Sequence, residues 1–145
     1  MYLEMDKDEI RFLIWRAQRE IEIATRMLGE GHFGDAVSHA YYAVIYAARA
    51  VLLTRNIDVL EHSTILPLFD SNLIRTGEIE RGYGKIFERI RAIHGVFEKY
   101  RRIRESAGDH VYVFVEEKTI KIVIEDAKKF LERMIKYLKR KKILK

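Results

Sequence analysis

The 145-residue chain contains no cysteine and a single proline, and it has no long apolar run. The lack of cysteine excludes disulfides and thiolate metal sites, and it fits a reducing compartment such as the cytoplasm. The longest uncharged apolar run, residues 40–48, is far shorter than the roughly 20 residues of a transmembrane helix. The N-terminus lacks the basic start and apolar run of a signal peptide. We therefore expect a soluble cytoplasmic protein with no membrane partner.

The composition indicates one globular domain spanning residues 1–145. A hydrophobic fraction of 48% at this length is enough to form a core without disulfides or structural metal ions. The formal net charge of +5 favours an anionic partner such as RNA. Charged residues of both signs make up 34% of the chain, however, so solubility alone explains the charge equally well.

Apolar residues recurring every three or four positions predict an all-α fold. We expect an up-and-down bundle of four to five helices, with long helices two, four and five around a central apolar helix. The first helix follows a start signal formed by Asp6 and Glu9 and covers residues 10–28. Residues 36–53 are apolar nearly all round, so this second helix is expected to be the central one, with Asp35 as its N-cap. Its alanines form a seam of small residues for close helix approach: Ala36, Ala40, Ala43, Ala47 and Ala50.

Three further helices follow. Ser63 or Thr64 is expected to cap a short third helix that ends near Thr76-Gly77. The fourth begins after Gly82-Tyr83-Gly84, and Gly108 is expected to end it. An extended connection over residues 109–115 then leads to a fifth helix from about Glu116. Its expected buried side comprises Ile120, Val123, Ile124, Ala127, Phe130, Leu131, Met134, Tyr137 and Leu138.

Positive charge gathers on the fourth helix. Only Glu88 and Glu98 oppose its seven cations, which are Lys85, Arg89, Arg91, Lys99, Arg101, Arg102 and Arg104. A solvated charged face is the common outcome for such a helix, but the arginines clustered at its end favour anion binding. A basic tail from Lys136 to Lys145 is expected to complement the last helix end and fray, with RNA contact as the alternative.

Arg49 is the charged residue of the apolar second helix, and an unpaired charge inside a bundle is costly. It either forms an ion pair with a carboxylate of a neighbouring helix or lies near the anion site.

The histidines show no metal-ligand spacing, so we expect neither a metal nor a cofactor. Four of the five follow an arginine with four to six residues between, which makes that spacing alone uninformative. The pair Arg104 and His110 stands out because an arginine cluster precedes it and Tyr112 follows. Arginine can neutralise a phosphate, and histidine can transfer a proton near neutral pH.

Several short blocks together resemble the small HEPN-domain proteins. In order, they are Ala40-Tyr41-Tyr42-Ala43, Ala48-Arg49-Ala50, His62-Ser63, Thr76-Gly77 and Tyr83-Gly84. The resemblance covers most of the chain. It implies an all-helical bundle, a symmetric homodimer and frequent pairing with a minimal nucleotidyltransferase as toxin and antitoxin.

In active members of that family, an arginine and a histidine separated by four to six residues form a metal-independent ribonuclease site at the dimer interface. Arg104 and His110 match this element. Some relatives carry His-x-Tyr, whose tyrosine accepts AMP from the nucleotidyltransferase, and Tyr112 matches that position. The branch with these blocks often has Ala-Asp-Tyr here, whereas this chain has one residue more and places His110 last.

Cleavage of RNA by its own 2′-hydroxyl needs a base, an acid and positive charge at the phosphate. One chain supplies one histidine at the motif, and a two-fold dimer would supply two. We therefore predict a ribonuclease toxin in which Arg104 stabilises charge, His110 transfers protons, and Arg101, Arg102 and Arg49 bind phosphate. The alternative is a noncatalytic module that binds nucleotide or docks the nucleotidyltransferase, and a third interpretation is a purely structural helical oligomer.

Overall fold

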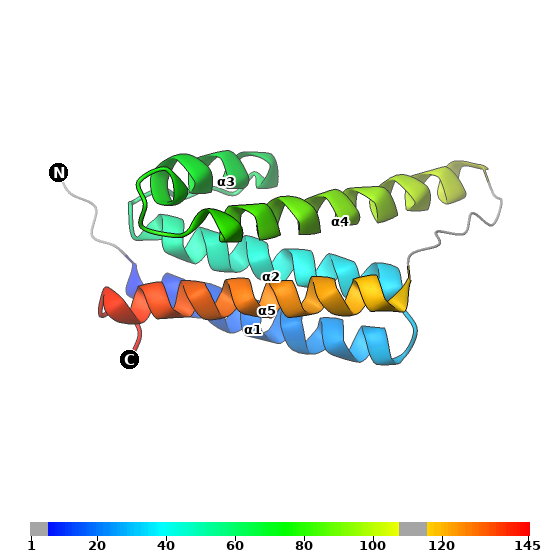
Figure 1. Ribbon diagram of the computed structural model, residues 1–145, viewed down its shortest axis with the longest axis horizontal. Coiled ribbons are helices and arrows are strands. Elements are labelled where there is room, and N and C mark those ends of the chain that lie inside the picture. The colour runs from blue at the N-terminus through cyan, green and yellow to red at the C-terminus, as the bar shows by residue number, and fades with distance from the viewer. Residues whose placement is uncertain (1–5, 108–115) are drawn as a thin grey trace.

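The structure is a computed structural model that describes residues 6–107 and 116–145. Within these ranges every regular element is a helix, which confirms the predicted all-α fold (Figure 1). The elements are α1 (Lys7–Gly29), α2 (Phe33–Leu53), α3 (His62–Phe69), the π-helical turn η1 (Asp70–Ile74), α4 (Arg81–Ala107) and α5 (Glu117–Arg140). The predicted extended connection over 109–115 lies outside the described residues.

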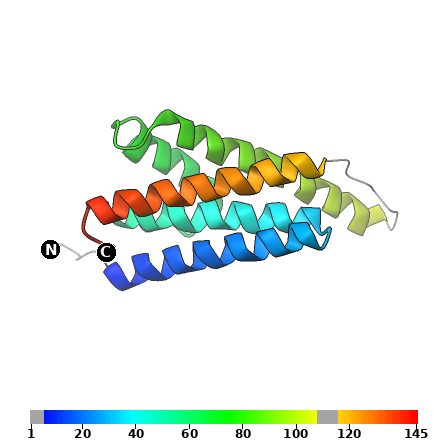
Figure 2. The ribbon, with the colours of Figure 1, turned by 60° about the horizontal axis from the view of Figure 1, so that its bottom comes forward.

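Helix α2 is the centre of the bundle, as its composition predicted. It contacts α1, α3, α4 and α5, and Figure 2 shows α1 and α5 running along it. All five alanines of the predicted seam are fully buried. Among the described helices, α2 alone is long and apolar enough to cross a membrane, and most of it is buried in the bundle.

Helix α1 is a long helix as well, so the predicted set of long helices was incomplete. Its N-cap is Asp6, whose carboxylate accepts hydrogen bonds from the backbone amides of Asp8 and Glu9 at 3.1 Å. Its contact with α2 is the most extensive in the bundle. The start signal predicted from Asp6 and Glu9 is confirmed.

The predicted starts of α2 and α3 were late by a few residues. Helix α2 begins at Phe33, so Asp35 lies in its first turn and is not the cap. Helix α3 begins at His62, one residue before the predicted caps, and the Thr64 hydroxyl donates back to the Glu61 carbonyl at 2.8 Å. Hydroxyl and carboxylate side chains stabilise several positions of a first turn, which makes the first residue hard to read from sequence.

Helix α4 begins at Arg81, so the Gly82-Tyr83-Gly84 block lies inside the helix instead of before it. The turn ahead of it is fixed by α5. Arg133 donates to the Glu80 carboxylate at 2.9 Å and to the Glu78 carbonyl at 3.1 Å, and the hydrogen bond from Arg133 lowers the pKa of Glu80. These contacts hold the chain just before Arg81. The first residue of α4 is therefore set by the contacts with α5 and not by Gly82 and Gly84.

The predicted buried side of α5 is confirmed at all nine positions. Phe130 from this side packs against Phe69 and Phe87 with ring centroids 5.4 and 5.8 Å away. The three rings join α3, α4 and α5 into one core.

The end of the chain folds back onto the bundle, so the fraying predicted for the basic tail is wrong. Ile143 is buried, and its amide donates to the Leu138 carbonyl at 2.9 Å. The turn places Lys142 at a φ of 62°. Burial of one apolar side chain outweighs repulsion among the lysines around it.

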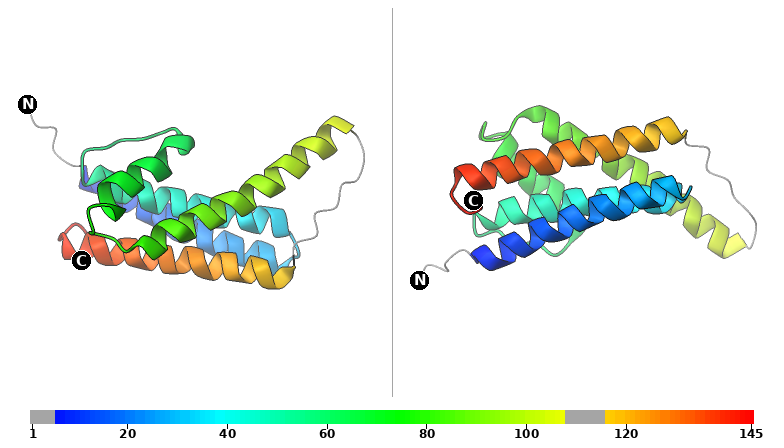
Figure 3. Two further views of the ribbon diagram at one scale, coloured as in Figure 1. Left: turned by 45° about the horizontal axis from the view of Figure 1, so that its top comes forward. Right: turned by 90° about the horizontal axis from the view of Figure 1, so that it is seen from below.

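The second half of α4 leaves the bundle, as Figure 3 shows. Ile90 is the last fully buried residue of α4 whose side chain is described. Beyond it, Val96 is 44% and Tyr100 37% exposed. The helix therefore carries its basic end away from the core.

Candidate functional site

The predicted arginine cluster lies on the projecting half of α4. Arg101 and Arg102 are exposed. Arg101 donates to the Glu98 carboxylate at 2.7 Å, and Arg102 donates to the Glu98 carbonyl at 3.5 Å. Arg104 follows within the same helix, three residues after Arg101. The Arg104 side chain, His110 and Tyr112 lie outside the described residues.

Arg49 lies apart from this cluster within one chain. The start of α2 is the part next to projecting α4, since a Cβ added to Gly34 would meet the Phe97 ring at 3.3 Å. Arg49 comes fifteen residues later, about 22 Å along the helix.

The ion pair predicted as one possibility for Arg49 is not formed with any described carboxylate. Its Nε atom is buried and has no hydrogen-bond partner among the described residues. The buried carboxylate of α1, Glu20, contacts Arg16 and His39 instead.

A cluster of histidines and tyrosines next to α4 was not predicted as a site. Tyr41 and Tyr42 of α2 lie at its centre. The His94 ring of α4 stacks on Tyr41 with centroids 4.4 Å apart and planes 4° apart. Tyr42 lies 6.2 Å from His62 of α3 and 6.3 Å from His39 of α2. Three helices thus bring three histidines around two tyrosines, and we call these five residues the His–Tyr cluster.

One member of the His–Tyr cluster is held by a buried carboxylate. His39 Nδ1 lies 2.5 Å from Glu20 Oε2, and Glu20 is only 5% exposed. Arg16 also contacts Glu20, at 3.4 Å, and donates to the Tyr46 hydroxyl at 3.1 Å. A carboxylate that accepts from Nδ1 fixes the ring orientation.

The surroundings of His94 favour its neutral form. Burial lowers its pKa below the ordinary 6.5, Glu98 opposes this shift, and Arg101 and His62 add to it. Its Nε2 lies 3.6 Å from a Glu98 oxygen, beyond hydrogen-bond range, and is otherwise buried without a partner. Glu98 therefore stands between the His–Tyr cluster on one side and Arg101 on the other.

The arrangement offers proton-transfer groups and cations along one side of α4. His39 is oriented by Glu20, the pKa of His94 is lowered by burial, and His62 is exposed. From His94, α4 continues to Arg101 and Arg102 near its end. The sequence held a partial signal for this cluster, because its tyrosines and His62 fall in the blocks Ala40-Tyr41-Tyr42-Ala43 and His62-Ser63.

Comparison with known proteins decides the family. The model of the HEPN domain matches residues 10–141, which includes all but the ends of the bundle. The chain belongs to the HEPN domain family. Both the His–Tyr cluster and the basic end of α4 lie inside the matched region.

Several HEPN relatives align over nearly the whole chain. "Putative toxin MJ0605" of Methanocaldococcus jannaschii is 29% identical over 133 residues, covering 92% of this chain and 91% of that protein. "Putative toxin MJ0142" of the same organism is 27% identical over 139 residues, with 96% and 88% covered. A "UPF0332 protein" of Thermotoga maritima is 30% identical over 129 residues, with 86% and 89% covered.

Proposed function

We propose that this HEPN protein is the toxin of a toxin–antitoxin pair and acts as a metal-independent endoribonuclease. Two similar proteins carry the word toxin in their names and match it over nine tenths of its length. The basic end of α4 supplies the positive charge that a phosphate substrate requires. The proposed location is cytoplasmic, where RNA substrates are found.

The observation that carries the proposal is the projection of α4 beyond Ile90, the last buried residue among those of α4 whose side chains are described. Val96 and Tyr100 are apolar or aromatic side chains exposed on a helix that also carries three arginines near its end. A second copy of the chain that covers these side chains buries apolar surface and brings two basic helix ends together. A homodimer of this kind completes a site of which each chain holds half.

In the proposed reaction, the 2′-oxygen of the RNA attacks the adjacent phosphorus. One His110 takes the 2′-hydroxyl proton, and His110 of the second copy gives a proton to the departing 5′-oxygen. Arg104 neutralises charge at the phosphate during the attack. The products are a 2′,3′-cyclic phosphate and a free 5′-hydroxyl, so the step needs no metal and no external reactant.

The residues nearby have supporting roles in this proposal. Arg101 and Arg102 hold phosphates next to the cleaved bond. His94 precedes Arg104 by ten residues, about 15 Å along α4, so the His–Tyr cluster is placed for contact with flanking nucleotides. Arg49 is too far along α2 to bind the same phosphate as Arg101 and Arg102 of its own chain. It would bind phosphate only as a residue of the second copy, or on a longer RNA strand.

We further propose that a minimal nucleotidyltransferase serves as antitoxin by transferring AMP to Tyr112. The added phosphate would be an anion close in sequence to Arg101, Arg102 and Arg104. It would compete with the RNA phosphate for these arginines and silence cleavage.

The deciding experiment is RNA digestion in EDTA by the wild type, His110→Ala and His32→Ala. His32 follows Arg26 with the same five-residue gap as His110 follows Arg104, so it is a matched control. We expect cyclic-phosphate products from the wild type and His32→Ala, and a loss of about 10²-fold or more in His110→Ala. Cleavage that EDTA abolishes, or that persists in His110→Ala, contradicts the proposal. Nucleotide binding without cleavage in every protein would favour the noncatalytic module.

A further inference from the structure

A second surface, far from the basic end of α4, exposes large aromatic rings. Phe12 and Trp15 on α1 are 55% and 52% exposed. Their rings stack with centroids 6.0 Å apart and planes 27° apart. Trp15 is the single tryptophan of the chain. The two rings form one contiguous exposed apolar patch, and such patches on folded domains mark interaction sites.

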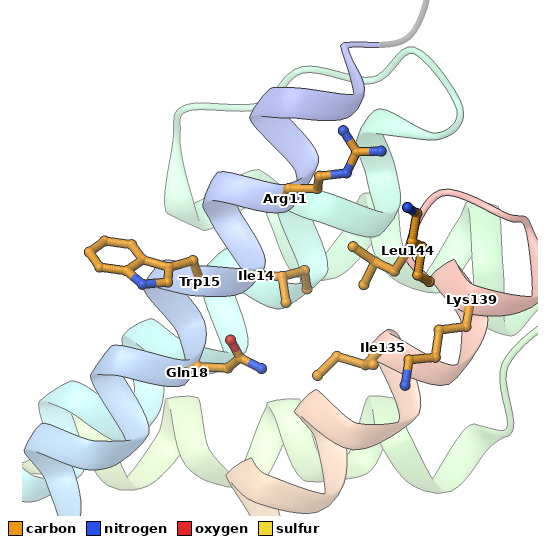
Figure 4. A pocket seen from close by; sticks show the side chains of 8 residues that line it. Arg11, Ile14, Trp15, Gln18, Ile135, Lys139 and Leu144 are labelled. Carbon is orange, nitrogen blue, oxygen red and sulfur yellow. The ribbon is translucent and has the colours of Figure 1, made fainter.

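An open pocket of about 400 Å³ lies between α1, α5 and the folded-back tail, and Trp15 stands at its edge with the ring pointing away from Ile135 and Leu144 (Figure 4). Ile14 and Ile135 line its apolar part, and Leu144 of the tail closes one side. The tail reaches this place because Ile143 is buried beneath it. The pocket is therefore part of the fold and does not depend on a frayed end.

The pocket rim is positively charged. Arg11, Lys139 and Lys145 line it. Arg11 is paired with Asp8 at 3.1 Å, whereas Lys139 and Lys145 form no ion pair within the described ranges 6–107 and 116–145. The Arg19 guanidinium lies 6.0 Å from the Trp15 ring centroid and is paired with Glu22. No carboxylate side chain lines the pocket among the described residues.

We propose that this surface binds single-stranded RNA, with bases stacking on Trp15 and Phe12 and phosphates held by Lys139, Lys145 and Arg11. Exposed rings beside a cationic groove are what single strands require, because bases stack on aromatic faces and the backbone follows the charge. Duplex bases are already stacked on each other and cannot use these rings. The choice of RNA as ligand rests on the proposed ribonuclease function.

The surface lies toward the end of the bundle opposite the basic end of α4 (Figure 1). Trp15 is fourteen residues before Gly29, the last residue of α1, or about 21 Å along that helix. A strand bound here extends along the bundle to reach a cleavage site. The surface therefore acts on the affinity for long substrates, through KM, and leaves the turnover of short ones unchanged.

Emission from Trp15 tests the proposal directly, because no other tryptophan contributes. A 2′-O-methyl oligonucleotide cannot be cleaved by 2′-oxygen attack, so binding is measured apart from catalysis. We expect the single strand to quench the emission and added salt to reverse the quenching. The same sequence as a duplex should leave the emission unchanged. Unchanged emission with the single strand at saturation, or equal quenching by the duplex, overturns the proposal.

Affinity of variants is followed by anisotropy of a labelled oligonucleotide. Trp15→Ala should weaken binding about tenfold, Trp15→Phe should retain most of the affinity, and Lys139→Ala should reduce its salt dependence. Ile122→Ala is the matched control, since Ile122 on α5 is also 52% exposed but does not line the pocket. Wild-type affinity in Trp15→Ala, or an equal loss in Ile122→Ala, overturns the proposal.

Two outcomes separate this inference from the ribonuclease proposal. His110→Ala should lose cleavage and keep the quenching at Trp15. If no protein cleaves RNA but Trp15 is still quenched, the ribonuclease proposal fails and the binding surface stands. If Trp15→Ala weakens binding of a purified nucleotidyltransferase and leaves RNA affinity unchanged, the surface is a protein interface and the inference is wrong.

Discussion

His39 Nδ1 and Glu20 Oε2 lie 2.5 Å apart, joining α2 to a carboxylate that is buried on α1. A carboxylate can only accept, so Nδ1 carries the proton and donates it. Glu20 also accepts from Arg16 at 3.4 Å. The two helices that share the most extensive contact in the bundle are thus tied together beside the His–Tyr cluster.

The first prediction concerns this carboxylate. Glu20→Gln keeps the size of the side chain but removes the charge that His39 and Arg16 contact. We expect the free energy of unfolding, measured with urea, to fall by about 2 kcal/mol, because hydrogen bonds to charged groups contribute about 1.5–3 kcal/mol. Glu22→Gln, on the same helix but exposed, should change it by less than about 0.5 kcal/mol. Equal effects of the two substitutions would refute the structural importance of the buried pair.

The second prediction concerns pH and His94. Its pKa is lowered in the folded protein, chiefly by burial, so the unfolded chain binds more protons as the pH falls below 6.5. The sign of the linkage then makes stability rise with pH. The stabilisation from neutral His94 is present above pH 6.5 and is lost as the pH falls through the lower folded pKa. Glu98 opposes this loss, while Arg101 and His62 add to it.

His94→Gln cannot titrate and provides the comparison for this prediction. Urea unfolding at several pH values between about 7.5 and 5 should give a shallower pH dependence in His94→Gln than in the wild type. Parallel curves for the two proteins would show that His94 does not contribute.

The third prediction concerns the projecting half of α4. Val96→Glu places a charge where the proposed second copy packs, and this should dissociate the dimer and remove RNA cleavage while leaving the fold intact. Mass measured by light scattering during size exclusion reports the assembly, and circular dichroism reports the fold. Leu60→Glu is the control, because Leu60 is 77% exposed in the segment before α3. A wild type that cleaves RNA as a monomer would be incompatible with the composite site.

The fourth prediction concerns Tyr112. After incubation with ATP and the partner nucleotidyltransferase, intact-mass measurement should show adenylate on the wild type and none on Tyr112→Phe. The modified wild type should lose RNA cleavage, because the added anion competes for the arginines. An adenylate that persists on Tyr112→Phe would move the modification to another residue.

The fifth prediction compares two glycines. A Cβ at Gly95, in the middle of α4, would meet nothing within 4 Å, whereas one at Gly34 would meet the Phe97 ring at 3.3 Å. Gly95→Ala should therefore raise the free energy of unfolding by about 0.5–1 kcal/mol through helix propensity alone. Gly34→Ala should raise the free energy of unfolding by less than this, or lower it, because the Phe97 ring must move to make room. A destabilised Gly95→Ala monomer would contradict this account.

Much of the architecture could be predicted because helix faces are a local property. The spacing of apolar residues identified α2 as the central helix and identified all nine buried positions of α5. The N-cap at Asp6 could also be predicted from the sequence, since it depends on backbone amides only two and three residues away. The starts at Phe33 and His62 were misplaced because side chains at several positions of a first turn can stabilise it, and the start at Arg81 was misplaced because Arg133 of α5 holds the turn before it.

The candidate site was only half predictable. The arginines at the end of α4 stand out in the sequence because they are consecutive or nearly so. His39, His62 and His94 are each separated by more than twenty residues, so nothing local relates them. The packing of α3 and α4 on α2 brings them around Tyr41 and Tyr42.

By itself the sequence determined the helical fold, the family-like blocks and the basic end of α4, since periodicity, motif order and charge runs are written along the chain. Only the tertiary structure decided that Glu20 holds His39, that Arg49 lies far from the arginines at the end of α4, and that the tail closes one side of the pocket between α1 and α5. The physical reason is that these relationships depend on which helices meet and at what register. Burial of the whole core fixes that register, and no single segment encodes it.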